Sequence, residues 1–294
     1  MTSAAARPDP RRHAWREDLA AESLRGQVEV PRYAAGEPHH VIRPAIALRR
    51  EPQFTASIET EALFGEAVIV YDIAAGWAWG QLERDRYVGY LPADALRRGA
   101  AATTHRVSAI GTFIYSAADI KAPPLMHLSL NAQLAVVERQ ERFSRLAGGG
   151  FAVNRHISER DRYARDFVDV AERLIGTPYL WGGRTRLGLD CSGLVQIAME
   201  AAGLRCPRDT DMQQAELGSE VLVPASLEGL QRGDLVFWRG HVGIMVDGLM
   251  IVHANAHHMA VAVEPLAVAV ERIRKSEGGM ASVRRLPKLS GDGA

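Results

Sequence analysis

The stretch GLDCSGLV, residues 188–195, places one of the chain's two cysteines between an aspartate and a serine, at the start of a run with helical spacing. Asp190 can accept backbone hydrogen bonds as an N-cap, which would put Cys191 in the first turn of a helix that runs to about Ala202. The free amides and the dipole at that end favour a thiolate, so we expect the pKa of the Cys191 thiol to fall toward neutrality. Cys206 follows the helix without such a setting, and we interpret it as a buried or incidental thiol.

Length and composition indicate about two or three domains, because 294 residues with 47% hydrophobic content can bury more than one core. The formal net charge is zero, which gives no electrostatic reason to expect nucleic acid or an anionic membrane as a partner. The N-terminal stretch contains no apolar run of signal-peptide length, and no segment approaches the roughly 18 apolar residues of a membrane span. We therefore expect a soluble cytoplasmic protein whose cysteines are free thiols, because that compartment keeps thiols reduced.

Short alternating apolar runs, separated by turn-forming residues, dominate the chain before residue 158. This pattern predicts small antiparallel β-barrels, with strands at residues 67–71, 77–82, 87–91, 112–115 and 134–138. The order of GWAWGQL and YVGYL resembles a bacterial SH3-like domain over residues 41–101, and a fainter copy occupies residues 102–157. Ordinary core packing is the alternative interpretation of the aromatic residues. We expect residues 1–40 to be a polar, partly helical lead-in, the GGG run at 148–150 a flexible joint, and the final LSGDGA a frayed tail.

The pattern becomes helical from Asp161 onward. Apolar residues on one face predict a helix over residues 163–175, which Gly176 and Pro178 would end. Downstream, DLVFWRGHVGIMVDGLMIVHANA predicts two hydrophobic strands joined at an Asp-Gly hairpin turn. His241 begins the first of these strands, and His253 ends the second.

The length of the hairpin loop decides whether the two histidines can cooperate, because side chains alternate between the faces of a strand. A two-residue turn would pair Val242 with His253 and leave His241 on the opposite face. A three-residue Asp-Gly-Leu loop pairs Gly243 with His253 and makes His241 its diagonal neighbour on the same face. We therefore predict the longer loop or a bulge, with Gly243 leaving room between the imidazoles.

The motifs TPYLWGG, LDCSGLV, RGDLVFW, HVGIMV and IVHA, over about residues 160–270, resemble the NlpC-type cysteine peptidases. The resemblance implies an α+β protein in which a papain-like catalytic domain at residues 158–290 follows one or two SH3-like barrels. It implies that Cys191 is the nucleophile, His241 the general base and His253 the residue that orients the base. Tyr179 matches the family's oxyanion site, and substrate contacts fall on Asp190 and Ser192.

An SH3-like region before such a domain resembles one subgroup, the γ-D-glutamyl-L-diamino acid endopeptidases. Their substrates are peptidoglycan stem peptides with a free amine on L-Ala, which implies a small peptide partner and no cofactor or metal. The subgroup places an acidic residue and a tyrosine near that amine, and the matching candidates are Glu59 or Glu61 and Tyr87. An ammonium group in a partly closed cleft favours a carboxylate partner. RDT at residues 208–210 resembles the segment that supplies a hydroxyl, which points to Thr210.

Other interpretations remain open at this stage. Cys191, His241 and His253 could instead ligate zinc, although no CxxC or HExxH spacing appears. The protein could be a wall-binding SH3-like protein that acts on polymeric peptidoglycan, or an acyltransferase on the same scaffold, rather than a muropeptide-recycling peptidase. We expect His257 and His258 to lie on a solvated turn, and we assign no role to the surface or loop histidines 39, 40, 105, 127 and 156. The oligomeric state does not follow from the sequence.

Overall fold

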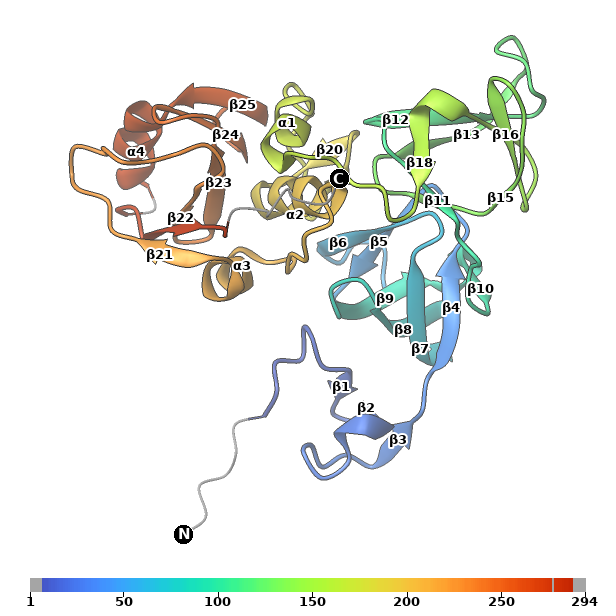
Figure 1. Cartoon of the computed structure of the whole chain (residues 1–294). Coiled ribbons are helices and arrows are strands. Elements are labelled where there is room, and N and C mark those ends of the chain that lie inside the picture. Colours follow the sequence, from blue (N-terminus) through green and yellow to red (C-terminus); the bar gives the residue numbers. More distant parts are fainter. Residues whose placement is uncertain (1–6, 277, 288–294) are drawn as a thin grey trace. The chain divides into compact units, whose positions relative to one another are not determined.

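The computed structural model describes residues 7–276 and 278–287, which divide into two compact units after Arg162 (Figure 1). The first unit consists of strands and short 3-10 helices, and the second combines α-helices with a sheet. This confirms the predicted α+β class. No helix among the described residues is long and apolar enough to cross a membrane. The predicted C-terminal tail, LSGDGA, lies outside the described residues.

A seven-stranded sheet, ordered β10-β4-β7-β8-β9-β5-β6, forms the first barrel of the first unit. Buried and half-buried residues alternate along β5 and β9, because one face of each strand packs on the core. That core includes Leu48, Val68, Leu82 and Leu91. The strands predicted at 67–71, 77–82 and 87–91 are confirmed, with the third shifted by one residue. The strands are β4 Glu37–Val41, β5 Ala45–Arg49, β6 Ile58–Leu63, β7 Ala67–Ala74, β8 Trp77–Leu82, β9 Val88–Pro92 and β10 Leu96–Arg98.

Two further sheets, ordered β13-β12-β17-β16-β15 and β14-β11-β18, follow in the first unit. The predicted strand at 134–138 is divided in two, because β14 ends at Leu134 and β15 begins at Val136. The expectation of a flexible joint at 148–150 is wrong. Gly149 and Gly150 form the turn between β16 and β17, with φ of 92° and 82°, a conformation that favours glycine. The strands are β11 His105–Val107, β12 Gly111–Tyr115, β13 Pro124–Ser129, β14 Gln133–Leu134, β15 Val136–Arg139, β16 Phe143–Leu146, β17 Phe151–Val153 and β18 Ile157–Glu159.

The lead-in predicted for residues 1–40 is mainly extended in its described part, and its helical content there is the 3-10 helix η1 (Glu22–Leu24). The segment also forms a small sheet of β1 (Trp15–Arg16), β2 (Leu19–Ala21) and β3 (Arg32–Ala34), and β4 already belongs to the first barrel. Its buried residues pack against Trp79 of β8, which is 4% exposed. The Arg16 guanidinium lies 4.7 Å from the centre of the Trp79 ring and pairs with Asp72. The segment therefore covers an aromatic face of the barrel. His39 of β4 is also buried, contrary to its expected surface position.

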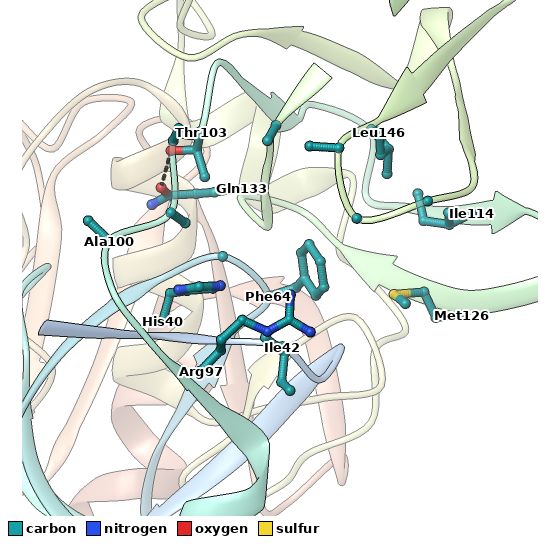
Figure 2. Close-up of a pocket in the computed structure, with 17 residues that line it drawn as sticks. His40, Ile42, Phe64, Arg97, Ala100, Thr103, Ile114, Met126, Gln133 and Leu146 are labelled. Atoms are coloured by element: carbon teal, nitrogen blue, oxygen red, sulfur yellow. Dashed lines mark hydrogen bonds between the residues drawn. The ribbon is translucent and has the colours of Figure 1, made fainter. Parts of the chain in front are cut away.

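The first barrel and the two sheets that follow it share a close backbone contact. The amide of Gln133 donates a 2.8 Å hydrogen bond to the carbonyl of Phe64. A Cβ atom on the neighbouring Gly65 would lie 2.3 Å from the Gln133 oxygen, so a larger residue would disrupt this contact. Beside this contact lies a crevice of about 460 Å³, and Figure 2 shows Arg97 and His40 on its first-barrel side.

A six-stranded sheet, ordered β21-β26-β22-β23-β24-β25, organises the second unit. Helix α4 packs against it through a buried cluster that includes Met245, Ile251 and Ile273. Helix α1 begins later than predicted because the Asp166 side chain caps it by accepting from the Val168 amide, and it also ends earlier, at Glu172. The helices are α1 Phe167–Glu172, α2 Cys191–Ala201, α3 Thr210–Glu216 and α4 Leu266–Arg274. The strands are β19 Arg184–Thr185, β20 Gly188–Leu189, β21 Ser219–Val221, β22 Leu235–Trp238, β23 His241–Met245, β24 Met250–Asn255, β25 Ala260–Pro265 and β26 Ser282–Arg285.

The packing of the N-terminal sheet on Trp79 generates a stability prediction. Leu19 of β2 is fully buried, so Leu19→Ala should lower the free energy of unfolding by about 2–5 kcal/mol. Leu125→Ala is the matched control, because Leu125 is 55% exposed and loses little burial. Urea denaturation followed by tryptophan fluorescence measures both variants. Equal stability of the two variants would contradict the packing.

Candidate active site

The hairpin formed by β23 and β24 has the loop length that brings the two histidines together. Ile244 pairs with Val252, Met245 pairs with Ile251, and the Val246 amide donates to the Met250 carbonyl at 2.8 Å. Asp247, Gly248 and Leu249 therefore form a three-residue loop, which confirms the prediction. The Asp247 carboxylate stabilises this loop by accepting from the amides of residues 249 and 250, at 2.7 and 2.8 Å.

His241 and His253 meet on one face of this hairpin. The distance from His241 Nε2 to His253 Nδ1 is 2.9 Å, and both rings are buried. Gly243 lies between them in register. A Cβ atom on Gly243 would lie 2.6 Å from the Ile251 side chain and 3.1 Å from the Cβ of His253, so glycine leaves the required space. The prediction that His253 ends its strand is wrong, because β24 continues to Asn255.

Helix α2 presents the candidate nucleophile beside the start of β23. Cys191 is the first residue of α2, and the Asp190 carboxylate caps the helix by accepting from the Gly193 amide at 2.7 Å. The Cys191 sulfur lies 3.9 Å from the Gly240 carbonyl oxygen, and the Val242 amide donates toward it. Gly240 and Val242 flank His241 in the chain. The thiol and the histidine pair thus belong to one site.

The charge state of this site differs from the sequence expectation. Burial, and then the negative charge of Asp190, raise the pKa of the Cys191 thiol to about 11, so the expected lowering is wrong. Burial outweighs the helix N-terminus because the thiolate loses its hydration there. Burial, followed by the proximity of His253 and Arg272, lowers the pKa of His241 to about 3. At neutral pH the resting pair is a neutral thiol and a neutral imidazole.

A buried arginine that sequence reasoning missed holds the residues around the nucleophile. Arg208 is 1% exposed and binds Asp190 through both ends of its guanidinium group, with nitrogen–oxygen distances of 3.0 and 2.6 Å. It also donates to the Ser192 hydroxyl at 2.7 Å. Arg208 is the first residue of the RDT motif at residues 208–210, in which the family resemblance points only to Thr210. The predicted substrate contacts of Asp190 and Ser192 stay predictions, and in the structure their side chains bind Arg208.

Thr210 and Tyr179 are the other predicted site residues of the second unit. The Thr210 hydroxyl, at the start of α3, is 3.9 Å from the Cys191 sulfur. Tyr179 forms a parallel bridge with Leu189, and its amide donates to Met259 at 2.9 Å. Its role at the oxyanion site stays a prediction. The predicted solvated turn is confirmed, since residues 257 and 258 are exposed between β24 and β25.

In the first unit, Glu59 and Glu61 lie on β6. The Tyr87 hydroxyl lies 3.5 Å from the Glu59 carboxylate, which also pairs with Arg50 at 3.1 Å. The structure thus brings Glu59 and Tyr87 together, and their predicted contact with a substrate amine stays a prediction.

Both cysteines are free thiols, as expected, and both are buried. Within residues 7–276 and 278–287, no group of three or more histidine, cysteine or acidic side chains is arranged to hold a metal ion.

Comparisons with known proteins identify the family. A model described as "NlpC/P60 family" matches residues 176–273, and one described as "Bacterial dipeptidyl-peptidase Sh3 domain" matches residues 48–96. The "Probable endopeptidase NlpC" of Escherichia coli is 40% identical over 110 residues, which cover 35% of this chain and 68% of that protein. The chain belongs to the NlpC/P60 family. The predicted resemblance to the NlpC/P60 cysteine peptidases with an SH3-like domain is confirmed.

Two longer matches extend beyond the NlpC/P60 domain. The "Gamma-D-glutamyl-L-lysine dipeptidyl-peptidase" of Bacillus subtilis is 27% identical over 218 residues, covering 67% of this chain and 72% of that protein. The crystal structure of an NlpC/P60 family protein from Bacillus cereus covers 85% of this chain and 100% of its own, with a TM-score of 0.69 and 19% identity, which shows a shared fold. Across the first curated relatives that it matches, the chain spans 25% to 72% of the relative's length.

The buried ion pair behind the nucleophile predicts a large effect of Arg208→Ala. Removal of the Arg208 guanidinium leaves the Asp190 carboxylate buried without its countercharge, so the free energy of unfolding should fall by about 3–5 kcal/mol. Arg186→Ala is the control, because Arg186 is exposed in the same unit. Urea denaturation measures both variants. An Arg208→Ala protein as stable as the control would show that the pair does not support the site.

The raised thiol pKa predicts how Cys191 reacts with iodoacetamide. Because the thiolate is the reactive form, labelling of Cys191 in the folded protein should keep rising with pH beyond 9, toward its pKa of about 11. Labelling in urea should instead level off about one unit above the ordinary cysteine pKa of roughly 8.5. Mass spectrometry of the Cys191 peptide gives both profiles. A plateau below pH 8 in the folded protein would indicate a preformed thiolate–imidazolium pair.

Proposed function

We propose that this NlpC/P60 protein hydrolyses the bond between γ-D-Glu and the following diamino acid in peptidoglycan stem peptides whose L-Ala has a free amine. Its role in the cell is then the recycling of small muropeptides in the cytoplasm. The observation that carries the proposal is the placement of a buried cysteine at a helix start beside a pair of hydrogen-bonded histidines. The Bacillus subtilis relative, whose name states a γ-D-glutamyl-L-lysine dipeptidyl-peptidase, supports the substrate class.

The first half of the reaction forms a thioester. His241 accepts the proton of Cys191, and the sulfur attacks the carbonyl carbon of the γ-amide. Negative charge develops on the carbonyl oxygen. The Cys191 amide is a donor suited to this charge, because the first N–H groups of a helix have no acceptor within it, and the Tyr179 hydroxyl is a second candidate. The carbon–nitrogen bond then breaks, and His241 transfers its proton to the departing amine.

The second half of the reaction restores the enzyme. His241, again neutral, accepts a proton from water, and the resulting hydroxide attacks the thioester carbon. The carbon–sulfur bond breaks, the dipeptide leaves with a free γ-carboxyl group, and the proton returns to Cys191. The neutral resting pair suits this cycle, because His241 begins each half as an unprotonated base.

Three substrates test the proposal. L-Ala-γ-D-Glu-diaminopimelate should yield L-Ala-D-Glu and diaminopimelate, measured by liquid chromatography, and Cys191→Ala should abolish turnover. The N-acetylated peptide should react at least about 10-fold more slowly, because a charge-assisted hydrogen bond contributes about 1.5–3 kcal/mol. Intact sacculi should not be hydrolysed, because the amine of their L-Ala is in an amide bond and is not free. Equal rates on the free and acetylated peptides, or release of products from sacculi, would favour the wall-acting alternative.

A further inference from the structure

We propose that Glu264 is a positioning residue that fixes the tautomers of both active-site histidines, so that Nδ1 of His241 is the atom that accepts the thiol proton. This inference deepens the proposed function and rests on it. No motif or pattern in the sequence points to Glu264. Its carboxylate binds His253 at the end of the hydrogen-bonded row opposite to His241, so it acts through His253 and not on the substrate.

Three side chains from adjacent strands form a continuous hydrogen-bonded row. His241 Nε2 lies 2.9 Å from His253 Nδ1, and His253 Nε2 lies 2.8 Å from Glu264 Oε1. Strand pairing places His253 opposite Ala262, so Glu264 is its diagonal neighbour on the same face of the sheet. His253 is fully buried and the Glu264 residue is 8% exposed, so bulk water hardly competes for these bonds.

Donor and acceptor roles along this row follow from its outer end. The guanidinium of Arg272, on α4, pairs with the same Glu264 oxygen, and a carboxylate in such an ion pair can only accept hydrogen bonds. Nε2 of His253 must therefore carry the hydrogen. In a neutral imidazole the other nitrogen is then an acceptor, so Nδ1 of His253 accepts from Nε2–H of His241. Nδ1 of His241 is left with the free lone pair.

The same row responds to charge during the reaction. His253 is surrounded by four titratable or charged groups: His241 on β23, Glu264 on β25, Arg272 on α4 and His258 in the following turn. Burial lowers the pKa of His253, Glu264 opposes this effect, and Arg272 adds to it. When His241 becomes an imidazolium, the Glu264 carboxylate compensates the new charge through the intervening ring, as an acidic residue does in other triads.

The substrate-free test reads the tautomers directly. The nitrogen chemical shifts of ¹⁵N-histidine-labelled full-length protein at pH 7 should show hydrogen on Nε2 of both rings in the unmodified protein. In Glu264→Gln the amide can also donate to His253, so the tautomers should become mixed or reversed. Glu271→Gln is the matched control, because Glu271 is an exposed residue of the same helix as Arg272. Unchanged tautomers in Glu264→Gln would overturn the inference whatever the substrate proves to be.

The kinetic test separates positioning from structural support. Glu264→Gln should lower kcat/KM about 10- to 100-fold, mainly through kcat, while Glu271→Gln matches the unmodified protein. Glu264→Asp keeps the charge and should recover part of the loss together with the original tautomers.

If Glu264→Gln folds poorly, Arg272→Gln gives an independent measurement. This variant removes the cation that lowers the histidine pKa values, so it should shift the acid limb of the pH profile of kcat/KM to higher pH. Rates within threefold of the unmodified protein for Glu264→Gln would overturn the inference, as would an unmoved acid limb in Arg272→Gln.

Discussion

The buried pairing of Asp190 with Arg208 is the interaction on which the position of the nucleophile depends. The Asp190 carboxylate caps α2 through Gly193 and also accepts from the Gly182 amide at 2.8 Å. Arg208 adds the loop before α3 to the same centre. Two buried charges are costly unless their hydrogen bonds are complete, and here both carboxylate oxygens accept several donors. One ion pair thus fixes the helix start, the preceding loop and the following loop relative to Cys191. This centre positions the thiol and does not activate it, because Asp190 raises the thiol pKa and Arg208 only partly offsets that effect.

Strand periodicity supplies the second constraint. His241, His253 and Glu264 come from three adjacent strands, and each is two positions away from direct opposition to the next. All three therefore point to one face of the sheet. A change of one residue in either connecting loop would move the outer member of the row to the opposite face. The loop residues 247–249 and the exposed turn after β24 thus set the strand register that aligns the three side chains, although none of them lies in the hydrogen-bonded row.

Local patterns in the sequence predicted the local parts of the structure. The cap at Asp190, the start of α2 and the three-residue hairpin loop follow from neighbouring residues and from side-chain alternation. Long-range contacts did not follow from such patterns. The segment before β4 is polar enough to suggest a lead-in, but Leu19 is buried because it packs in one cluster with Trp79, sixty residues later in the chain. Arg208 and Glu264 acquire their partners through tertiary packing. The raised pKa of the Cys191 thiol does not follow from such patterns either, because helix position is visible in the sequence and burial is not.

The neutral resting state has a physical consequence for how reactivity is controlled. A thiolate–imidazolium pair at this depth would have to be held by charges strong enough to offset the lost hydration of both ions. With the thiol pKa raised to about 11 and the His241 pKa lowered to about 3, the protein instead stores the proton on sulfur. Such a cysteine reacts slowly with solvent electrophiles and oxidants, since the thiolate is the reactive form. Reactivity must then arise during attack itself, when the imidazolium forms. The charge that stabilises it is already in place at the far end of the histidine row, so the site can be inert at rest and still supply a base.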